Sequence, residues 1–200
     1  RLKLDPTPSL TLLAAVFNGD PAGPALDAQK ANHYGTSFRV QDPALVMAEG
    51  QYRYNQDKGP GGLAGTVRLG GWYHFGDFAD QRLGTDGLSL ANPLSTGNPL
   101  QHGGNWGIYG VIDQQIWRPA SGEPDKGIGV FARVAGSPAD RNLVDFYIDG
   151  GIVFSGVVPG RPDDSFGAAI AYARISGDAR NLDRDLIAGL AITGSARYRS

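Results

Sequence analysis

Charged and amide side chains recur at every second position along several stretches of the chain, for example at Glu49, Gln51 and Arg53. If they share one face, their chemistry suits a carbohydrate, because arginine donates hydrogen bonds to hydroxyl oxygens and carboxylates accept them from hydroxyl groups. An aromatic ring can cover the C–H face of a pyranose. The residues that we expect to contact such a solute are Glu49, Arg53, Arg68, Trp72, His74, Asp113, Gln115, Arg133, Asp145, Asp149 and Arg174, with Trp106, Trp117 and Tyr147 as further aromatic surfaces. The alternative for any one of them is a polar side chain that only pairs with its neighbours.

The sequence contains no pattern typical of an enzyme or a metal site. His33, His74 and His102 lack metal-ligand spacing, and there is no nucleophile elbow or phosphate-binding loop. The G-x-G-x-x-A pattern at 127–132 is not followed by a helical pattern, so a dinucleotide site is not expected there. Asp163-Asp164 lacks the ligand spacing of a calcium loop. We therefore expect no enzyme, no metal and no cofactor.

Composition favours strands over helices and excludes several partners. Of 200 residues, 30 are glycine, and charged residues make up only 19%. The 18 basic and 20 acidic residues leave a net charge of -2, so no broad basic field can hold nucleic acid. Without cysteine there is neither a disulfide framework nor a cysteine zinc site. The longest apolar stretches fall far short of the ~18 residues that a transmembrane helix needs.

Hydrophobic residues alternate with polar ones, which predicts strands with two different faces. The clearest strands are 46–54, 66–75, 127–135 and 143–155, and the weaker ones are 9–17, 36–41, 105–117, 165–176 and a last strand from Leu186 onward. Turn-rich segments separate them, and no helical pattern lies between them. The sequence thus predicts an all-β, antiparallel meander of eight or nine strands, with Val67, Leu69, Val130, Ile148 and Ile152 on its convex side.

The hairpin around Pro138 predicts a specific register. Pairing Arg133 with Asp145 matches both faces of the two strands at once, and a cross-strand ion pair would fix that register. In the strand at 105–117 neither phase is clean, and we place Asp113 on the polar side.

Periodicity alone does not say which face is buried, since a membrane barrel reverses the arrangement of a soluble sheet. Aromatic residues favour the membrane barrel, because they lie on the apolar faces and mostly near strand ends, as in interfacial girdles. They are Tyr52, Tyr54, Tyr73, Phe75, Phe146 and Phe154. The alternatives are a soluble all-β carbohydrate-binding module and a complete eight-stranded barrel with a structural role.

Several segments, in this order and spacing, resemble the bacterial carbohydrate-selective porins of the OprB type: 71–75 (GWYHF), 105–110 (NWGIYG), 113–115 (DQQ), 127–133 (GIGVFAR) and 159–164 (PGRPDD). The resemblance implies a 16-stranded barrel in the bacterial outer membrane that admits mono- or oligosaccharides through a water-filled pore. Its partners would be small sugars and outer-membrane lipid, and self-association is left open. We expect residues 1–200 to be a single partial barrel domain, an internal fragment of about half the barrel.

Residues 77–104 form the longest segment without clear periodicity. Loops of this length are usually functional or disordered, so we expect either a constriction loop folded into the pore or a surface loop. Strict alternation places this segment at the same end of the sheet as the turns at Asp42-Pro43 and Pro138, which should be short periplasmic turns. Arg53, Arg68 and Arg133 are the candidates for constriction residues.

Overall fold

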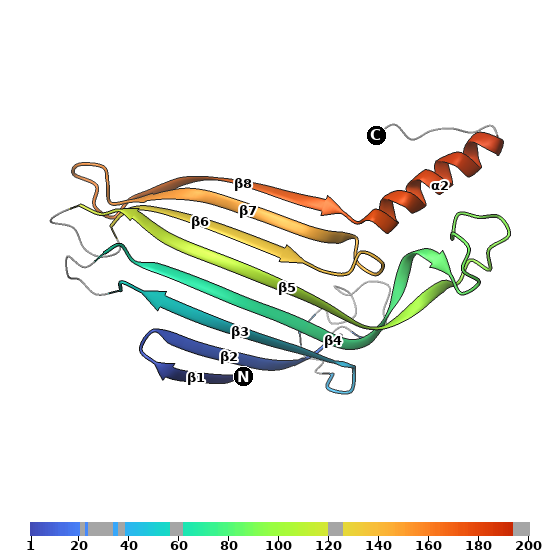
Figure 1. The fold of residues 1–200 in the computed structure, drawn as a ribbon, viewed down its shortest axis with the longest axis horizontal. Helices are drawn as coiled ribbons and strands as arrows, with labels where there is room; N and C mark the ends of the chain where they lie inside the picture. Colours follow the sequence, from blue (N-terminus) through green and yellow to red (C-terminus); the bar gives the residue numbers. More distant parts are fainter. Residues whose placement is uncertain (21–22, 24–33, 36–38, 57–61, 120–125, 194–200) are drawn as a thin grey trace.

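The computed structural model of the chain describes residues 1–20, 23, 34–35, 39–56, 62–119 and 126–193. In this part of the chain eight strands form one sheet, and each strand pairs antiparallel with the next along the sequence (Figure 1). The strands are β1 Leu2–Thr7, β2 Leu10–Asn18, β3 Ala44–Tyr54, β4 Gly65–Gly84, β5 Pro99–Trp117, β6 Gly127–Gly136, β7 Val144–Ser155 and β8 Ser165–Ile175. The predicted all-β meander is confirmed. Among the described residues the sheet is open, with β1 and β8 at its edges.

The strand register separates two faces. One continuous row of paired positions runs through Leu12, Gly50, Leu69, Gly110, Val134, Ile148 and Tyr172. The adjacent row runs through Thr11, Gln51, Arg68, Val111, Arg133, Asp149 and Ala171. Because alternate residues of a strand point to opposite faces, the first row belongs to an apolar face and the second to a polar face.

The apolar face is uncovered. Leu69 is 67% exposed and Ile170 is 81% exposed, and no hydrophobic side chain in the described part of the chain is buried. Val67, Leu69, Val130, Ile148 and Ile152 all fall on this face, as predicted. A sheet with one face that is apolar across its middle is typical of a wall in contact with lipid.

Two rows of aromatic side chains border the apolar face. One row lies near the end of the sheet that carries the β7–β8 turn, and the other lies near the opposite end. The rows contain Tyr52, Tyr54, Trp117, Phe154 and Phe166 in the first, and Tyr73, Phe75, Trp106, Phe146 and Tyr172 in the second. Along β7 the rows are eight positions apart, about 26 Å at ~3.3 Å per residue, which suits the ~25 Å apolar band of a tilted membrane strand.

Strands β4 and β5 continue well beyond the other strands, as a bent arm at one end of the sheet (Figure 1). The structure therefore corrects the expectation of a long loop at 77–104, since only 85–98 connects the two strands. Register shifts between His74 and Asp77 and between Ala79 and Gly84 interrupt the alternation of the arm. We call residues 77–104 the arm.

The β6–β7 hairpin has a different register from the predicted one. Arg133 pairs with Asp149, and Ala135 pairs with Tyr147. The Arg133–Asp145 pairing was wrong because the connection is centred further along the chain, where Asn142 is held by side-chain hydrogen bonds to Asn105 and to the Pro138 carbonyl. The shift is an even number of residues, so both faces are preserved.

A helix takes the place of the predicted last strand. Helix α2 spans Gly177–Thr193, whereas residues 194–200 lie outside the described part. The Ser176 hydroxyl accepts a hydrogen bond from the Ala179 N–H at 3.2 Å, and Asp178 lies in the first turn, both of which stabilise a helix N-terminus. No helix in the described ranges is long and apolar enough to cross a membrane.

The connection between β2 and β3 is longer than the sequence predicted. Residues 39–41 are not a strand, and residues 36–38 lie outside the described part. The Gly19 N–H donates to the Pro43 carbonyl at 3.0 Å, so Pro43 lies at the base of a connection from 19 to 43. The end of β2 and the start of β3 lie at the same end of the sheet as the arm (Figure 1). In the described residues Asp42 and Pro43 therefore do not join two strands directly, whereas the β6–β7 connection at 137–143 is short.

Candidate functional site

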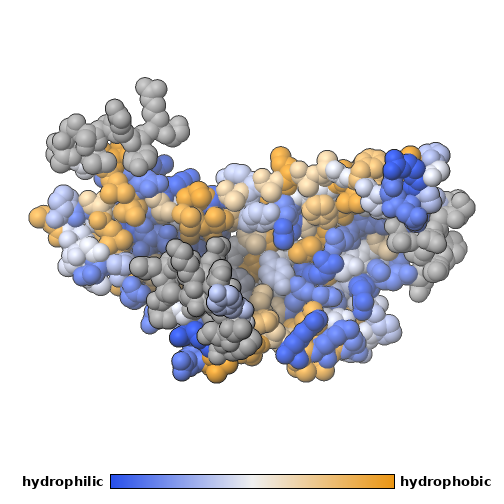
Figure 2. All heavy atoms as spheres, turned by 180° about the vertical axis from the view of Figure 1, so that it is seen from behind, coloured by the Kyte–Doolittle hydropathy of each residue, from blue (hydrophilic) through white to orange (hydrophobic). Residues whose placement is uncertain are grey.

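Ion pairs between neighbouring strands cross the polar face, and Figure 2 shows hydrophilic side chains gathered over the middle of the sheet. Arg133 contacts Asp149 through two nitrogens, at 2.5 and 3.2 Å. The Tyr147 hydroxyl donates to the same carboxylate at 2.9 Å, and the Arg133 guanidinium lies 5.2 Å from the centre of the Tyr147 ring. Arg133 remains 49% exposed, so its charge faces the solvent in front of the sheet.

A second group of polar contacts joins β3, β4 and β5. Arg68 pairs with Asp113 at 3.0 Å, which confirms that Asp113 lies on the polar side. Glu49 accepts hydrogen bonds from Tyr109 at 2.6 Å and from the Gln51 amide at 2.5 Å. Arg68 and Asp113 lie on neighbouring strands, whereas Tyr109 of β5 reaches Glu49 of β3 across Gly70 of β4, which stands in register with both.

Arg53 belongs to a third group at the β1 edge of the polar face. It donates to the Thr11 hydroxyl at 3.1 Å, and that hydroxyl donates to Asp5 at 2.6 Å. Lys3 pairs with Asp5 at 3.1 Å. The three groups place both signs of charge across the wall.

Trp72, His74 and Gln115 lie at the two ends of the polar face. Trp72 pairs with Gly107, and His74 pairs with Asn105, both toward the arm. The His74 Nδ1 accepts a hydrogen bond from the Gly76 N–H at 2.9 Å, which holds the ring near the base of the arm. Gln115, at the opposite end, donates to the Lys126 carbonyl at 2.9 Å.

Arg174 does not occupy the position that the sequence predicted. It pairs with Phe146, on the phase of the apolar face, and its guanidinium lies 5.5 Å from the Phe146 ring centre. A register shift between Val144 and Phe146 brings Asp145 within 2.8 Å of Arg174. Arg174 and the nearly buried Asp145 therefore form an ion pair at the margin of the sheet, and the prediction that Arg174 points into a lumen was wrong.

Two of the expected aromatic surfaces lie on the apolar face. Trp106 pairs with Tyr73 and is 44% exposed, and Trp117 pairs with Ile128 and is 46% exposed. The register shift between Gln115 and Trp117 moves Trp117 to this face. Both tryptophans thus belong to the aromatic rows, whereas Tyr147 lies on the polar face as expected.

Several aromatic rings lie over glycines of the neighbouring strand. A Cβ added to Gly70 would lie 2.5 Å from the Tyr109 ring, and one added to Gly107 would lie 2.5 Å from the Trp72 indole. Tyr109 was not selected from the sequence as a site residue, because tyrosine is also common on the apolar faces. Tyr109 and Asp113 are an even number of residues apart in the same strand, and this spacing could have placed Tyr109 on the polar face.

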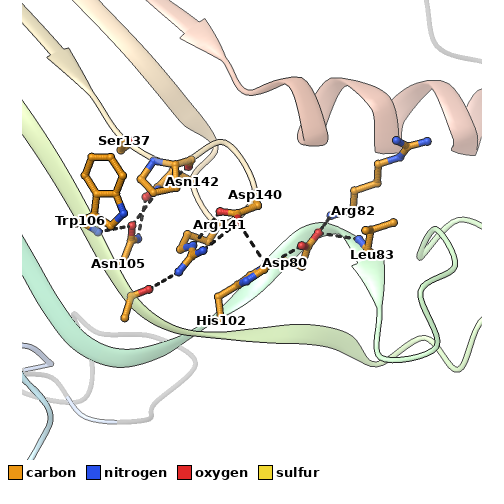
Figure 3. A network of polar contacts seen from close by, with 12 residues as sticks. Asp80, Arg82, Leu83, His102, Asn105, Trp106, Ser137, Asp140, Arg141 and Asn142 are labelled. Carbon is orange, nitrogen blue, oxygen red and sulfur yellow. Dashed lines mark hydrogen bonds and ion pairs between the residues drawn. The ribbon is translucent and has the colours of Figure 1, made fainter.

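The arm carries a second, more enclosed polar cluster (Figure 3). The Asp80 carboxylate is 5% exposed and accepts hydrogen bonds from the backbone N–H groups of Arg82 and Leu83, both at 2.7 Å. His102 Nε2 lies 2.7 Å from the same carboxylate and 3.8 Å from Asp140 in the β6–β7 turn. Burial raises the pKa of Asp80, but the hydrogen bonds from Leu83, His102 and Arg82 outweigh it, and the resulting pKa lies below the usual value.

Further contacts attach the arm to the β6–β7 turn. Arg141 pairs with Asp140 at 2.8 Å and donates to the Gly104 carbonyl at 2.6 Å, and this guanidinium lowers the pKa of Asp140. Asn105 and Asn142 exchange two hydrogen bonds of 2.9 Å through their side-chain amides (Figure 3). These side chains, together with the Gln81 N–H that donates to the Asp140 carbonyl at 2.6 Å, fix the base of the arm to the β6–β7 turn.

Helix α2 contacts the arm through Asp185, which pairs with Arg82 and hydrogen-bonds with Ser89. Arg82 Nε lies 2.9 Å from Asp185, and the carboxylate raises the pKa of the arginine. The same pair lowers the pKa of Asp185. The arm thus positions the helix beyond the aromatic row of the sheet.

Comparison with known proteins gives one consistent result. The family model described as "Carbohydrate-selective porin, OprB family" matches residues 1–197. Porin B of Pseudomonas aeruginosa is 29% identical over 122 residues, which are 61% of this chain and 26% of that protein. The structure described as the high pH structure of Pseudomonas putida OprB matches 98% of this chain and 43% of its own, with a TM-score of 0.79 and 24% identity. The chain therefore spans less than half the length of these relatives.

Proposed function

The chain belongs to the carbohydrate-selective porin family OprB, whose members lie in the bacterial outer membrane, and we propose that it forms part of the wall of a channel for passive, selective diffusion of mono- or oligosaccharides. The observation that carries the proposal is the separation of the two faces. An uninterrupted apolar face lies between two aromatic rows, and ion pairs cross the opposite face. Such a wall suits lipid on one side and a water-filled pore on the other.

We further propose that the described strands are about half of a 16-stranded barrel, with residues 1–200 as one partial domain. The open edges at β1 and β8 and the 43% coverage of the solved relative support this size. A closed barrel would pair both edges and remove their unpaired backbone groups from the lipid.

The pore wall that we propose consists of the polar-face residues. Arg68 and Arg133 lie in the same register row on either side of Val111, and Arg53 lies one position further along the polar face of β3. Arginine donors suit hydroxyl oxygens, and the paired carboxylates accept from hydroxyl groups. The proposed sugar contacts are Glu49, Arg53, Arg68, Trp72, His74, Asp113, Gln115, Arg133 and Asp149, with the three arginines at the constriction. Asp145 is left out of this set because it is nearly buried beside Arg174.

The mechanism that we propose is non-covalent and needs no cofactor, metal or catalytic residue. A selective channel must bind its solute well enough to admit it and weakly enough to release it. Arginines already paired with carboxylates meet this need, since each sugar hydroxyl replaces water at a site whose charge is already balanced. Lipid around the apolar face is the other proposed partner, and self-association stays an open proposal.

The soluble carbohydrate-binding module is a weaker alternative. Such a module would need a buried apolar core, and the described residues provide none. Leu69, Ile170 and the aromatic rows would instead face water, which favours aggregation.

The test is the ion current of the full-length protein in planar bilayers, measured with and without added glucose or maltose. A porin of this kind gives a steady conductance that sugar reduces in a saturable way, and the same protein in liposomes admits the sugar. Erythritol, a small polyol without a pyranose ring, is the control and should block much less. A protein that stays monodisperse without detergent and gives no conductance would overturn the proposal.

A further inference from the structure

A hollow of about 310 Å³ lies on the polar face, at the end of the sheet away from the arm. It is bordered by strands β4 to β7, and three of its lining positions, Gly65, Gly127 and Gly129, have no side chain. The side chains that matter for its chemistry are Thr66, Asp113, Gln115, Phe131 and Val153. Its volume is at the lower end of ligand pockets, which suits a single sugar ring.

The Phe131 ring forms one side of this hollow. Phe131 pairs with Gly151 of β7, and a Cβ added to that glycine would lie 2.8 Å from the ring atom Cε1. The ring therefore lies close to the Gly151 backbone, and Phe131 lines the hollow. A flat apolar surface among polar groups is what the C–H face of a pyranose requires.

Asp113 stands directly opposite Phe131 on β5. Directly opposite residues of antiparallel strands have Cβ atoms ~5 Å apart, so a sugar lying on the ring is within reach of this carboxylate. The Oδ2 atom is enclosed and lies 3.0 Å from Arg68, whereas the side chain as a whole is 46% exposed. Oδ1 is thus left to accept a hydrogen bond from a hydroxyl group, and Thr66, paired with Asp113 on β4, adds a further hydroxyl.

The charge of the hollow favours a neutral ligand. Arg68 balances Asp113, and Lys126, whose backbone lines the hollow, directs its ammonium group to the Pro162 carbonyl and to Asp163. An anionic sugar would meet the Asp113 carboxylate, and the further arginines nearby, Arg118 and Arg53, are engaged by Gln115 and the Gly62 carbonyl and by Thr11.

We propose that this hollow, which we call the Phe131 subsite, binds one neutral pyranose unit. The sugar's C–H face lies on the Phe131 ring, one hydroxyl donates to Asp113, and a neighbouring hydroxyl accepts from Arg68. The inference rests on the proposed channel function and adds to it a fixed stacking position away from the arm. Phe131 was not among the residues selected from the sequence.

Phe131→Leu tests the subsite, because it keeps an apolar side chain and removes the ring. In planar bilayers with the full-length protein we expect glucose block to weaken about two- to tenfold, the range of a lost aromatic contact, with ionic conductance unchanged. Phe131→Tyr keeps the ring and should retain the block. Phe154→Leu makes the same exchange on the apolar face, where Phe154 stacks on Phe166 at 4.8 Å, and should leave the block unchanged.

Asp113→Asn is the second variant, and it should weaken the block by glucose while reducing discrimination against gluconate. If Phe131→Leu does not assemble, the test becomes the comparison of glucose block between Asp113→Asn, which should weaken it, and Phe131→Tyr, which should retain it. Full glucose block in both Phe131→Leu and Asp113→Asn would overturn the subsite and leave the channel function standing. A parent protein without any sugar block or sugar uptake would overturn the channel function itself.

Discussion

In the middle of the sheet, the ion pair between Arg133 and Asp149 lies on a surface where the arginine is 49% exposed, whereas in the arm the Asp80 carboxylate is only 5% exposed. The first pair follows from regular strand pairing. The second group consists of backbone N–H groups and one histidine gathered around a carboxylate where the register shifts. An aspartate thus forms an exposed ion pair in the sheet, whereas in the arm it accepts hydrogen bonds from the backbone.

The polar face of the sheet, which we call the wall, and the arm therefore differ in what stabilises them. On the wall, the backbone is satisfied by strand pairing, so the polar side chains are available to a solute. In the arm, side chains replace missing ladder contacts, and their loss exposes backbone groups. We expect the wall to tolerate changes of its polar side chains and the arm to resist them.

The largest effect should come from a charge on the apolar face. Leu69→Arg places a guanidinium between the aromatic rows, which costs about 2–4 kcal/mol at the midplane of a bilayer. Reversible unfolding of the full-length protein in lipid vesicles measures this cost. Ala171→Arg, opposite Asp149 on the polar face, is the matched control and should cost much less. Equal costs for both variants would remove the distinction between the two faces.

The next effect concerns Asp80. Asp80→Ala leaves the N–H groups of Arg82 and Leu83 without their acceptor, at about 1–3 kcal/mol. Amide hydrogen exchange should therefore speed up across the arm while the rest of β4 and β5 keeps its protection. Asp77→Ala, an exposed neighbour, serves as the control. Uniform exchange changes over the whole sheet would show that the arm is not a separate unit.

Acid should loosen the arm in the same way. The pKa values of Asp80 and Asp140 lie below the ordinary value of 3.8. Their stabilisation is thus complete above about pH 4 and is lost as the pH falls through the lowered values. Hydrogen exchange of the arm, corrected for the intrinsic rate, should be constant from pH 7 to about 4 and faster below. Loss of protection already near pH 6 would contradict this assignment.

The smallest effect on stability is expected on the wall. Arg133→Ala should change the unfolding free energy by only ~0–1 kcal/mol, but it leaves Asp149 unpaired and removes a donor fork. We expect weaker sugar block and more preference for cations in planar bilayers, with Arg133→Lys in between. Arg161→Ala, which breaks the exposed pair with Asp164 in the β7–β8 turn, should leave both unchanged. Unchanged block in Arg133→Ala would exclude this arginine from the sugar path.

The sequence predicted the faces of the sheet well, because alternation is a local property and survives errors in register. The partners of individual side chains were harder to predict. A shift of an even number of residues kept Arg133 on the polar face but changed its partner from Asp145 to Asp149. Arg174 was assigned to the wrong face, because it shares the phase of Phe166, Ile170 and Tyr172 along β8.

Irregular regions could not be predicted from alternation. The arm was taken for a loop because its register shifts hide the period of two, and its stability depends on contacts such as Asn105 with Asn142, far apart in the sequence. Helix α2 did carry a local signal, since Ser176 and Asp178 are typical of a helix N-terminus. The glycine-rich composition of the chain concealed that signal.

The pairing of flat aromatic rings with glycines has a consequence for how such a channel can diversify. Because a Cβ on Gly70 would strike Tyr109, and one on Gly107 would strike Trp72, a single methyl group at either glycine would tilt a ring out of the wall and into the path of the solute. In the channel that we propose, the width of the passage would thus depend on glycines that need no contact with the solute. Natural variation at these glycines should alter the size of solute that the proposed channel admits, even where all the proposed sugar contacts are unchanged.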